Sequence, residues 1–255
     1  MPESFRIVIP ARYGASRLPG KPLVDIGGKT LIARVWEQAG ASAAAEVVVA
    51  TDDQRVVDHC RAIGADAALT GAHLQSGTDR VAELAAARGW APDDIVVNLQ
   101  GDEPLMPPAL IDQVAAALMG ADGAPMATLA APITEAAALF DPHVVKVVTD
   151  AAGSALYFSR APIPWHRDEF LRGRARLPQG THFLRHIGLY AYRVGFLARF
   201  VAWPPAPLEV AESLEQLRAL WHGERIHVAI ADVEPGPGVD TADDVRAVLS
   251  RLASI

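Results

Sequence analysis

The chain has 255 residues, of which 51% are hydrophobic and 21% charged, a composition that excludes an intrinsically disordered protein. A net charge of −7 argues against wholesale binding of nucleic acid. No apolar run is long enough to span a bilayer and no secretory signal is apparent, so we expect a cytoplasmic protein without membrane partners. The single cysteine, Cys60, cannot form an internal disulfide, and we expect it in the core.

Strand and helix patterns alternate through the first half of the chain. Apolar runs predict buried strands at 7–10, 46–51 and 95–100, and apolar periodicity predicts helices at 30–39, 53–63, 76–88 and 108–119. This alternation is typical of a mostly parallel sheet covered by helices on both faces. We therefore expect a three-layer, Rossmann-like α/β fold in which residues 1–255 form a single domain.

The pattern changes after residue 144. Two short strands, 144–149 and 155–159, are joined by the hairpin signal Asp150-Ala-Ala-Gly153, and a further strand is expected at 183–192. The polar, basic stretch 166–179 between them is expected to be a mobile loop. We expect an inserted antiparallel lobe at about 144–193, which with the apolar residue Trp165 supports formation of a homodimer.

The loop after the first strand, within IVIPARYGASRLPGKPL (7–23), has the composition of a phosphate-binding site. It carries Arg12, Gly14, Arg17, Gly20 and Lys21. Glycines let the backbone approach an anion and cations neutralise it, although an ordinary basic surface loop is the alternative. The spacing matches neither a Walker A loop nor the G-x-G-x-x-G dinucleotide loop, and Pro22 stands where Walker A has its metal-binding hydroxyl. Any Mg²⁺ must therefore be held by residues elsewhere.

Two later stretches carry polar residues at element ends. In QSGTDR (75–80), Ser76 or Thr78 can cap the next helix, while Gly77 and Arg80 indicate an anion or a polar base at the helix start. Asp102 follows the strand 95–100, at the end where open α/β sheets bind their ligands. The next helix begins several residues later, which favours metal binding over capping for Asp102.

The remaining acidic candidates have simpler explanations. The pair Asp52-Asp53 is interpreted as capping the helix 53–63. A single helix is predicted over 208–221, and on it Glu209, Glu212 and Gln216 would share one face, for which solvent exposure is the usual reason. Thr241 with Asp244 predicts a capping box, which leaves Asp240 free for another role.

The arrangement P-A-R-x3-S-R-L-P-G-K-P-L resembles the signature of sugar-activating cytidylyltransferases. Along nearly its whole length the chain resembles the 3-deoxy-manno-octulosonate (Kdo) cytidylyltransferases, the CMP-Kdo synthetases of Gram-negative lipopolysaccharide biosynthesis. The matching stretches, in order, are IPARYGASRLPGKPL, HLQSGTDR, VNLQGDEP, VKVV, ALYFSRAPIPW, FLRHIGLYAYR, PLEVAESLEQLR, GERIHVA and GVDTADD. The stretch 166–179 is the least similar part, so no function is assigned to it.

The resemblance implies that CTP and Kdo react to give CMP-Kdo and pyrophosphate on a homodimeric nucleotidyltransferase. It implies roles in triphosphate binding and catalysis for Arg12, Arg17 and Lys21, with Asp102 also catalytic. It implies CTP recognition by Ser76, Gly77, Arg80 and Gln100, and Mg²⁺ binding by Asp102 and Asp240. For the sugar it implies Gln100, Arg160, His186, Tyr190, Glu209, Glu212 and Gln216, with Arg160 pairing the carboxylate.

Two other classes of function stay open at this point. A CMP-sialic acid synthetase, or another sugar nucleotidyltransferase, would share the first loop but not FLRHIGLY together with PLE-x2-E-x3-Q. A non-enzymatic nucleotide-binding protein would keep the phosphate-binding loop but would need no second metal carboxylate such as Asp240.

Overall fold

The computed structural model of the protein describes residues 4–14 and 17–253. The strands are β1 (Phe5–Ala11), β2 (Glu46–Thr51), β3 (Asp66–Leu69), β4 (Ile95–Asn98), β5 (Met126–Pro132), β6 (Lys146–Thr149), β7 (Ala155–Ser159), β8 (Leu184–Arg193) and β9 (Ile226–Ile230). The helices are η1 (Lys21–Leu23), α1 (Leu31–Gly40), α2 (Gln54–Ala62), α3 (Gly77–Ala87), α4 (Pro108–Gly120), α5 (Ala136–Phe140), α6 (Arg167–Arg172), α7 (Val194–Ala202), α8 (Pro207–Glu212), α9 (Leu217–Trp221) and α10 (Ala242–Leu252).

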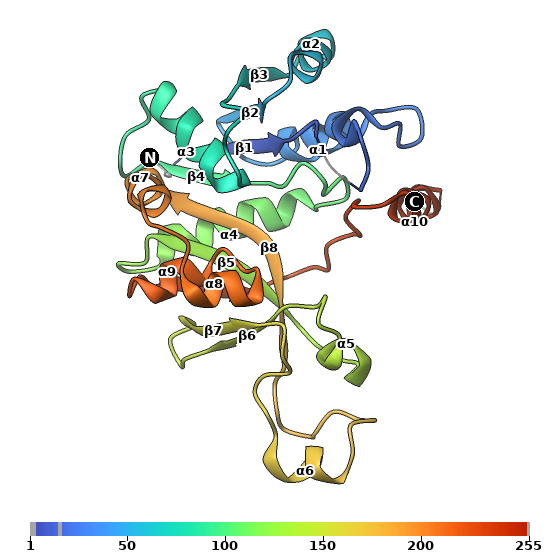
Figure 1. Ribbon diagram of the computed structural model, residues 1–255, viewed down its shortest axis with the longest axis vertical. Helices are drawn as coiled ribbons and strands as arrows, with labels where there is room; N and C mark the ends of the chain where they lie inside the picture. The colour runs from blue at the N-terminus through green and yellow to red at the C-terminus, as the bar shows by residue number, and fades with distance from the viewer. Residues whose placement is uncertain (1–3, 15–16, 254–255) are drawn as a thin grey trace.

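The strands form one mixed sheet in which seven follow the order β3-β2-β1-β4-β8-β5-β9, while β6 and β7 lie off this path and join it through β8 (Figure 1). β1 pairs in parallel with β2 and β4, and β5 pairs in parallel with β9. β8 lies between β4 and β5 and runs antiparallel to both. The predicted mostly parallel sheet is confirmed, with β8 as its antiparallel strand.

Helices cover both faces of the sheet because its central strands are apolar on both sides. On β1, Ile7 and Ile9 face a core cluster that includes side chains of α1, α2, α4 and α10. Val8 points the other way, into a cluster with side chains of α3, α7 and α9. Strands buried on both faces are expected to be continuously apolar, and β1 is so from Ile7 to Ala11. The three-layer α/β architecture predicted from the sequence is confirmed.

The predicted hairpin is present and joins the main sheet through β8. The β6–β7 turn has Gly153 at φ +79°, and the Asp150 carboxylate accepts hydrogen bonds from the turn backbone. β6 pairs with the first residues of β8, whereas the last residues of β8 pair with β4. The antiparallel segment therefore shares this long strand with the body of the molecule (Figure 1).

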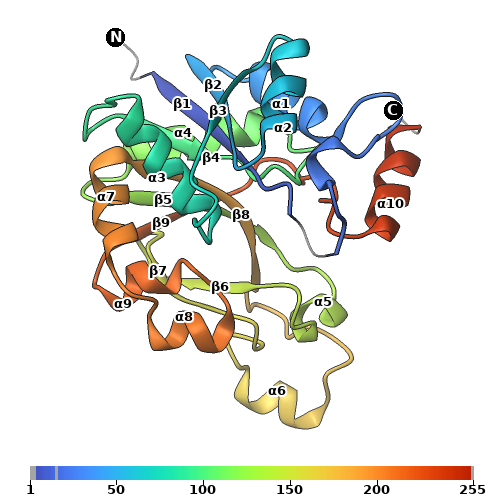
Figure 2. The same ribbon diagram turned by 45° about the horizontal axis from the view of Figure 1, so that its top comes forward.

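The stretch 166–179, expected to be a loop, contains the helix α6. Phe170 on this helix is buried against Phe183 and Leu139 in a small third cluster. A buried aromatic anchor of this kind is a reason for local order that a polar composition hides. Figures 1 and 2 both show α6 projecting away from the sheet, at the far end of the hairpin region.

The single helix predicted over 208–221 is wrong. α8 ends at Glu212, Ser213 takes a left-handed conformation with φ 52° and ψ 49°, and α9 begins only at Leu217. A left-handed residue breaks the i to i−4 hydrogen-bond ladder and turns the chain. Glu209, Glu212 and Gln216 consequently do not share one continuous helix face.

The C-terminal segment returns across the molecule to the start of the chain. After β9, at the far edge of the sheet, residues 231–241 run back to α10, which lies beside the loop that precedes α1 (Figures 1 and 2). The predicted capping box of α10 is confirmed, because Thr241 accepts from the backbone of Asp244 and Asp244 accepts from Thr241. Within residues 4–14 and 17–253, no helix combines the length and apolarity needed to cross a membrane.

Candidate functional site

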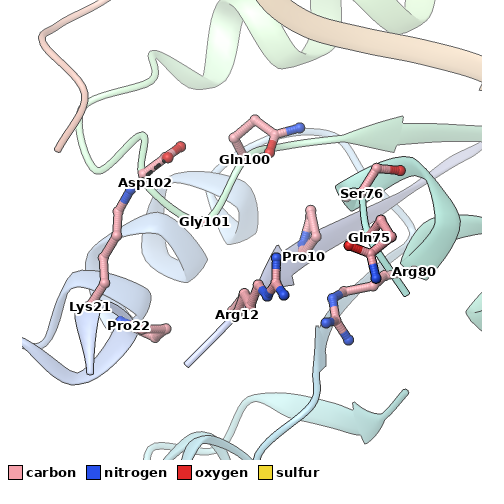
Figure 3. Close-up of a pocket in the computed structure, with 12 residues that line it drawn as sticks. Pro10, Arg12, Lys21, Pro22, Gln75, Ser76, Arg80, Gln100, Gly101 and Asp102 are labelled. Carbon is pink, nitrogen blue, oxygen red and sulfur yellow. Dashed lines mark hydrogen bonds and ion pairs between the residues drawn. The ribbon is translucent and has the colours of Figure 1, made fainter. Parts of the chain in front are cut away.

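A pocket lies where β1 and β4 end, and the sequence motifs meet there. It is lined by Pro10, Ala11, Arg12, Lys21, Pro22, Gln75, Ser76, Gly77, Arg80, Gln100, Gly101 and Asp102 (Figure 3). The lining comes from three stretches that are far apart in the sequence: the basic loop, the start of α3 and the turn after β4. This is the carboxyl end of parallel strands, where ligands of open α/β sheets bind.

Two glycines let the backbone segments of this pocket pack closely. A Cβ atom at Gly101 would lie 2.6 Å from the carbonyl oxygen of Pro10, so no larger residue fits without moving the backbone. A Cβ atom at Gly77 would lie 3.1 Å from the ring of Pro10 and 3.4 Å from the amide oxygen of Gln100. Gly77 and Gly101 therefore allow the close approach that forms the pocket.

The start of α3 is held by a capping box and by a buried arginine. The Ser76 hydroxyl accepts from the Asp79 amide at 3.1 Å, and the Asp79 carboxylate accepts from the Ser76 amide at 3.0 Å. The Arg80 side chain is only 2% exposed and donates to Asp52 at 2.9 Å and to the Thr70 hydroxyl at 2.7 Å. The anion that the sequence predicts beside Arg80 is thus supplied by the chain itself, as Asp52.

Asp52 is a site residue that the sequence interpretation missed. Its two oxygens accept from the Tyr13 amide at 3.2 Å and from Arg80 at 2.9 Å, and the Arg12 guanidinium lies 4.0 Å away. The capping interpretation of the acidic pair is right for Asp53, which caps α2, and wrong for Asp52. The available signal was the position of Asp52 directly after β2, the parallel neighbour of β1.

Lys21 joins the two carboxylates that the resemblance assigns to Mg²⁺. Its ammonium donates to Asp102 at 2.7 Å and to Asp240 at 2.9 Å, and Arg17 lies 3.0 Å from the second oxygen of Asp240 (Figure 3 shows the Lys21–Asp102 pair). Burial lowers the pKa of Lys21, but the charges of both carboxylates and their hydrogen bonds outweigh it and raise the pKa overall. Arg17, Lys21 and both carboxylates therefore form one connected charge cluster.

Asp102 and Asp240 converge because backbone segments 102–105 and 236–240 pack directly on each other. The Val239 amide donates to the Asp102 carbonyl at 2.8 Å. A Cβ atom at Gly238 would lie 3.1 Å from the carboxylate of Glu103, which shows how close the two segments are. The predicted convergence is confirmed, although Asp240 reaches the site through the returning segment 231–241 and not directly from a strand end.

The chemistry of these residues fits a magnesium ion. Mg²⁺ takes oxygen ligands, usually one or two carboxylates together with substrate phosphate and water. Asp102 and Asp240 supply two carboxylates, and burial, followed by the charge of Asp102, raises the pKa of the neighbouring Glu103 to about 8. No cluster of three or more His, Cys, Asp or Glu side chains in the described parts of the chain forms a metal site by itself.

The residues implied in sugar binding fall into two groups: those with polar groups left for a ligand, and those whose polar groups are engaged within the protein. Arg160 is partly exposed, and its guanidinium donates to the backbone carbonyls of Glu212 at 2.6 Å and Pro142 at 3.0 Å. Both carboxylate oxygens of Glu212 are occupied, one by the Ser159 hydroxyl at 2.6 Å and the other by the Arg160 amide at 2.8 Å. Arg160 retains unused N–H groups for a ligand, whereas Glu212 holds Arg160 in place.

Glu209 is likewise engaged within the protein. Its carboxylate forms a bidentate pair with Arg218 at 2.5 and 2.8 Å and accepts from the Ala206 amide at 2.9 Å. Gln216 differs, because it is 4% exposed and its side-chain nitrogen has no hydrogen-bond partner among the described residues. A buried amide donor without a partner is uncommon and is available to a ligand.

His186 and Tyr190 lie together on β8, with ring centres 5.3 Å apart. The Nε2 atom of His186 is 3.0 Å from the Thr128 hydroxyl. Burial lowers the pKa of His186 to about 3 and raises that of Tyr190, so both side chains are uncharged at neutral pH. An uncharged imidazole can bind a sugar hydroxyl without adding charge to the site.

Glu215 is a second residue that the sequence interpretation missed. One oxygen accepts from the Thr78 hydroxyl at 2.6 Å, and the other is buried without a partner among the described residues. Burial raises the pKa of this carboxyl. Glu215 links the start of α3 to the loop between α8 and α9. The prediction of one continuous helix over 208–221 gave no indication of this contact.

Comparison with known proteins identifies the family. A cytidylyltransferase family model matches residues 6–226. A 3-deoxy-manno-octulosonate cytidylyltransferase of Pseudomonas fluorescens is 60% identical over 248 residues, covering 97% of this chain and 98% of that protein. One from Idiomarina loihiensis is 56% identical over 243 residues, covering 95% and 96%.

Solved structures agree with this assignment. A CMP:2-keto-3-deoxy-manno-octonic acid synthetase complexed with CTP superimposes with a TM-score of 0.90 at 41% identity, covering 99% of both chains. A 4-diphosphocytidyl-2C-methyl-D-erythritol synthase, at 16% identity and a TM-score of 0.65, shares the fold. By its sequence over almost the whole length, this chain belongs to the cytidylyltransferase family and, within it, to the 3-deoxy-manno-octulosonate cytidylyltransferases.

Proposed function

We propose that this protein transfers CMP from CTP to Kdo, giving CMP-Kdo and pyrophosphate, and so activates Kdo for lipopolysaccharide biosynthesis. The observation that carries the proposal is the charge cluster of Lys21, Asp102 and Asp240 beside the pocket at the ends of β1 and β4. Membership of the Kdo cytidylyltransferases supports the choice of both substrates.

In this proposal the anomeric hydroxyl of Kdo attacks the α-phosphorus of CTP and gives its proton to solvent. The bond from the α-phosphorus to the oxygen that bridges to the β-phosphate breaks, which releases pyrophosphate. Both substrates are anions, so they must be brought together against their mutual repulsion. Arg12, Arg17 and Lys21 neutralise the triphosphate, while Ser76, Gly77 and Gln100 line the pocket for the nucleotide. Positioning and electrostatic stabilisation of this kind carry most of the catalysis in phosphoryl-type transfer.

Asp102 and Asp240 are the residues that would hold Mg²⁺. The ion, when bound, supplies positive charge to the phosphate oxygens and makes the attacking hydroxyl more acidic. The present partner of these carboxylates, the ammonium of Lys21, would then be free to turn to a phosphate. Glu103 lies beside the pair and adds negative charge to the cation site on ionisation.

For the sugar acid we propose Arg160 as the partner of the carboxylate, because a guanidinium presents a planar fork that matches it. His186, Tyr190 and Gln216 are proposed to contact the sugar hydroxyls. The carboxylates of Glu209 and Glu212 are occupied by protein donors. In this proposal they hold neighbouring side chains in place and do not contact the sugar.

The test is an assay of pyrophosphate release by the purified protein with CTP and Mg²⁺, comparing Kdo with N-acetylneuraminate. We expect turnover with Kdo and a far lower kcat/KM for N-acetylneuraminate. Comparable kcat/KM values for both acids would favour a sialic acid synthetase. Binding of CTP without turnover of either acid would favour a nucleotide-binding protein that is not an enzyme.

We propose in addition that the protein is a homodimer of the cytoplasm. Leu156 on β7 is 62% exposed. Among the described strands β7 forms a ladder with β6, and an isolated bridge between Ser154 and His227 ties the start of β7 to β9. Association with a second copy would remove this exposed apolar side chain from water.

A further inference from the structure

Lys146 on β6 is a charged side chain with no exposure to solvent. Its exposed fraction is 0%, and its ammonium donates to three backbone carbonyls: those of Asp141 at 2.8 Å, Val144 at 2.5 Å and Arg160 at 2.6 Å. Lysine is almost never fully buried unless it is paired, and the hydrogen-bond partners of this ammonium in the described part of the chain are backbone carbonyls. The three N–H groups of the ammonium therefore all donate to backbone carbonyls.

Two of these three contacts organise the turn that precedes β6. Asp141 and Val144 flank the dipeptide Pro142-His143, and the carbonyl of Pro142 accepts from the Arg160 guanidinium at 3.0 Å. The third contact is to the carbonyl of Arg160 itself. Lys146 thus acts on Arg160 along two routes, directly through its backbone and indirectly through the turn that receives its side chain.

Glu212 completes the arrangement from the opposite side. Its carboxylate accepts from the Arg160 amide at 2.8 Å, and its backbone carbonyl accepts from the Arg160 Nε atom at 2.6 Å. The amide of Arg160 is therefore bound by an anion, and its carbonyl by a cation. Charged hydrogen bonds are the stronger kind, and two of them on a single residue restrict its position more than neutral contacts do.

We infer that Lys146 is a positioning residue for the sugar acid: through three backbone carbonyls it holds Arg160 at the orientation in which the guanidinium meets the carboxylate of the substrate. This inference rests on the proposed role of Arg160. A core lysine serving stability alone would not need to contact both the backbone of Arg160 and the turn that binds its side chain. Burial lowers the pKa of Lys146, while the charges of Asp141 and Glu212 act in the opposite direction.

The test compares Lys146→Met, which keeps the apolar stem and removes the ammonium, with Val147→Ala on the same strand. Val147 is buried, pairs with Phe158 and Leu184, and makes no hydrogen bond to Arg160 or to the 141–144 turn through its side chain. The readouts are kcat/KM for Kdo, KM for CTP and the melting temperature. Arg160→Ala and the double variant Lys146→Met/Arg160→Ala complete the set.

We expect Lys146→Met to lower kcat/KM for Kdo by about ten- to a hundredfold, as displacement of a substrate-positioning group does, with KM for CTP within about twofold. Val147→Ala should leave kcat/KM for Kdo within about threefold of the value for the unmodified protein. We expect this even if its melting temperature falls as far as that of Lys146→Met. In the Arg160→Ala background, Lys146→Met should add less than about twofold, since the group it positions is gone.

Three outcomes would overturn the inference. The first is a loss of kcat/KM for Kdo in Lys146→Met that is no greater than in Val147→Ala. The second is an equal loss for CTP and Kdo in Lys146→Met. The third is an effect of Lys146→Met on kcat/KM for Kdo that is fully additive with that of Arg160→Ala. If Arg160→Ala lowers kcat/KM for Kdo and Lys146→Met does not, the inference alone fails. If Arg160→Ala has no effect, the proposed role of Arg160 fails too. Should Lys146→Met not fold, Lys146→Gln, which keeps two amide hydrogens, is measured by the same criteria.

Discussion

At the scale of single residues, the proposed Mg²⁺ site predicts how kcat responds to the loss of either carboxylate, Asp102 or Asp240. Asp102→Asn and Asp240→Asn should each lower kcat by about a hundredfold or more, because each removes a charge that would hold Mg²⁺ at the reacting phosphate. CTP should still bind through Arg12, Arg17 and Lys21. The measurement is pyrophosphate release over a range of Mg²⁺ concentrations.

The matched control is Asp243→Asn, three residues along the chain from Asp240 on the exposed face of α10, where the carboxylate pairs with Arg246. This variant should keep normal turnover at every Mg²⁺ concentration, because an exposed ion pair contributes little. Near-normal turnover of Asp102→Asn or Asp240→Asn at limiting Mg²⁺ would show that the residue concerned is not a metal ligand.

Cys60 makes a prediction about chemical reactivity. It is buried in α2, and burial raises the pKa of its thiol to about 11. The thiolate is the reactive form, so at pH 8 only about a thousandth of the folded protein carries it. We expect no modification by a thiol reagent over an hour at pH 8, and one modified thiol per chain after unfolding in guanidinium chloride.

The reactivity of Cys60 is measured by mass spectrometry before and after unfolding, with enzyme activity followed in parallel. Rapid labelling of the folded protein would show that α2 opens readily or that Cys60 is not in the core. Cys60→Ala is the control for labelling at any other residue, and it should take up no reagent in either state.

At this scale the sequence indicated which residues carry charge but not what each one contacts. The cations Arg12 and Lys21 and the carboxylate Asp102 could be predicted because they follow buried strands. Asp52 and Lys146 could not, since one looks like a helix cap and the other like an ordinary residue of an apolar strand. Their roles depend on neighbours that are distant in sequence, Arg80 and Arg160, which only the packed chain brings near.

At the scale of elements, the break between α8 and α9 is the main departure from prediction. Helical periodicity runs through 208–221 without a glycine or proline to interrupt it, so the pattern alone favours one helix. Tertiary contacts decide otherwise: Glu212 is drawn to Arg160, while Glu215 and Gln216 turn inward. Local propensity is a weak preference that buried hydrogen bonds of this kind override.

The break itself predicts a stabilising substitution. Ser213 is the one non-glycine residue with positive φ in the described part of the chain. The left-handed conformation costs a residue with a side chain about 1 to 2 kcal/mol, while glycine loses about 0.5 to 1 kcal/mol more backbone entropy on folding. Ser213→Gly should therefore raise the free energy of unfolding by roughly 0.5 to 1 kcal/mol.

Ser250→Gly provides the matched control, because the same substitution is then made inside α10 on an exposed face. There glycine should lower the free energy of unfolding by about 0.5 kcal/mol or slightly more. Both values are read from urea unfolding curves. The same sign for both variants would contradict the strain attributed to Ser213.

At the scale of the whole molecule, the alternation of apolar strands and amphipathic helices was enough to predict the layers and the parallel core. It could not predict that β8 enters the main sheet, because the sequence of a strand does not show which other strands it pairs with. Nor could it predict the return of residues 231–241 from the far edge of the sheet, which brings Asp240 to Asp102. Both features depend on sheet order, which has no local signature in the chain.

Assembly is the remaining prediction at this scale, and it depends on the exposed edge of the β6–β7 hairpin. Leu156 on β7 is 62% exposed, and burial of this side chain against a second copy would favour a twofold dimer. Leu156→Asp would place a charge in that contact and should raise the dissociation constant by about tenfold or more. Light scattering after size-exclusion chromatography, over a range of protein concentrations, measures the change.

Leu69→Asp is the control, since Leu69 is 55% exposed on β3, at the opposite edge of the sheet. A charge at Leu69 should leave the molar mass unchanged, because that edge takes no part in the proposed contact. A monomer for the unmodified protein at assay concentrations would refute the dimer. A dimer unaffected by Leu156→Asp but lost in Leu69→Asp would locate the interface on β3, and the hairpin edge would then need another explanation for its exposed leucine.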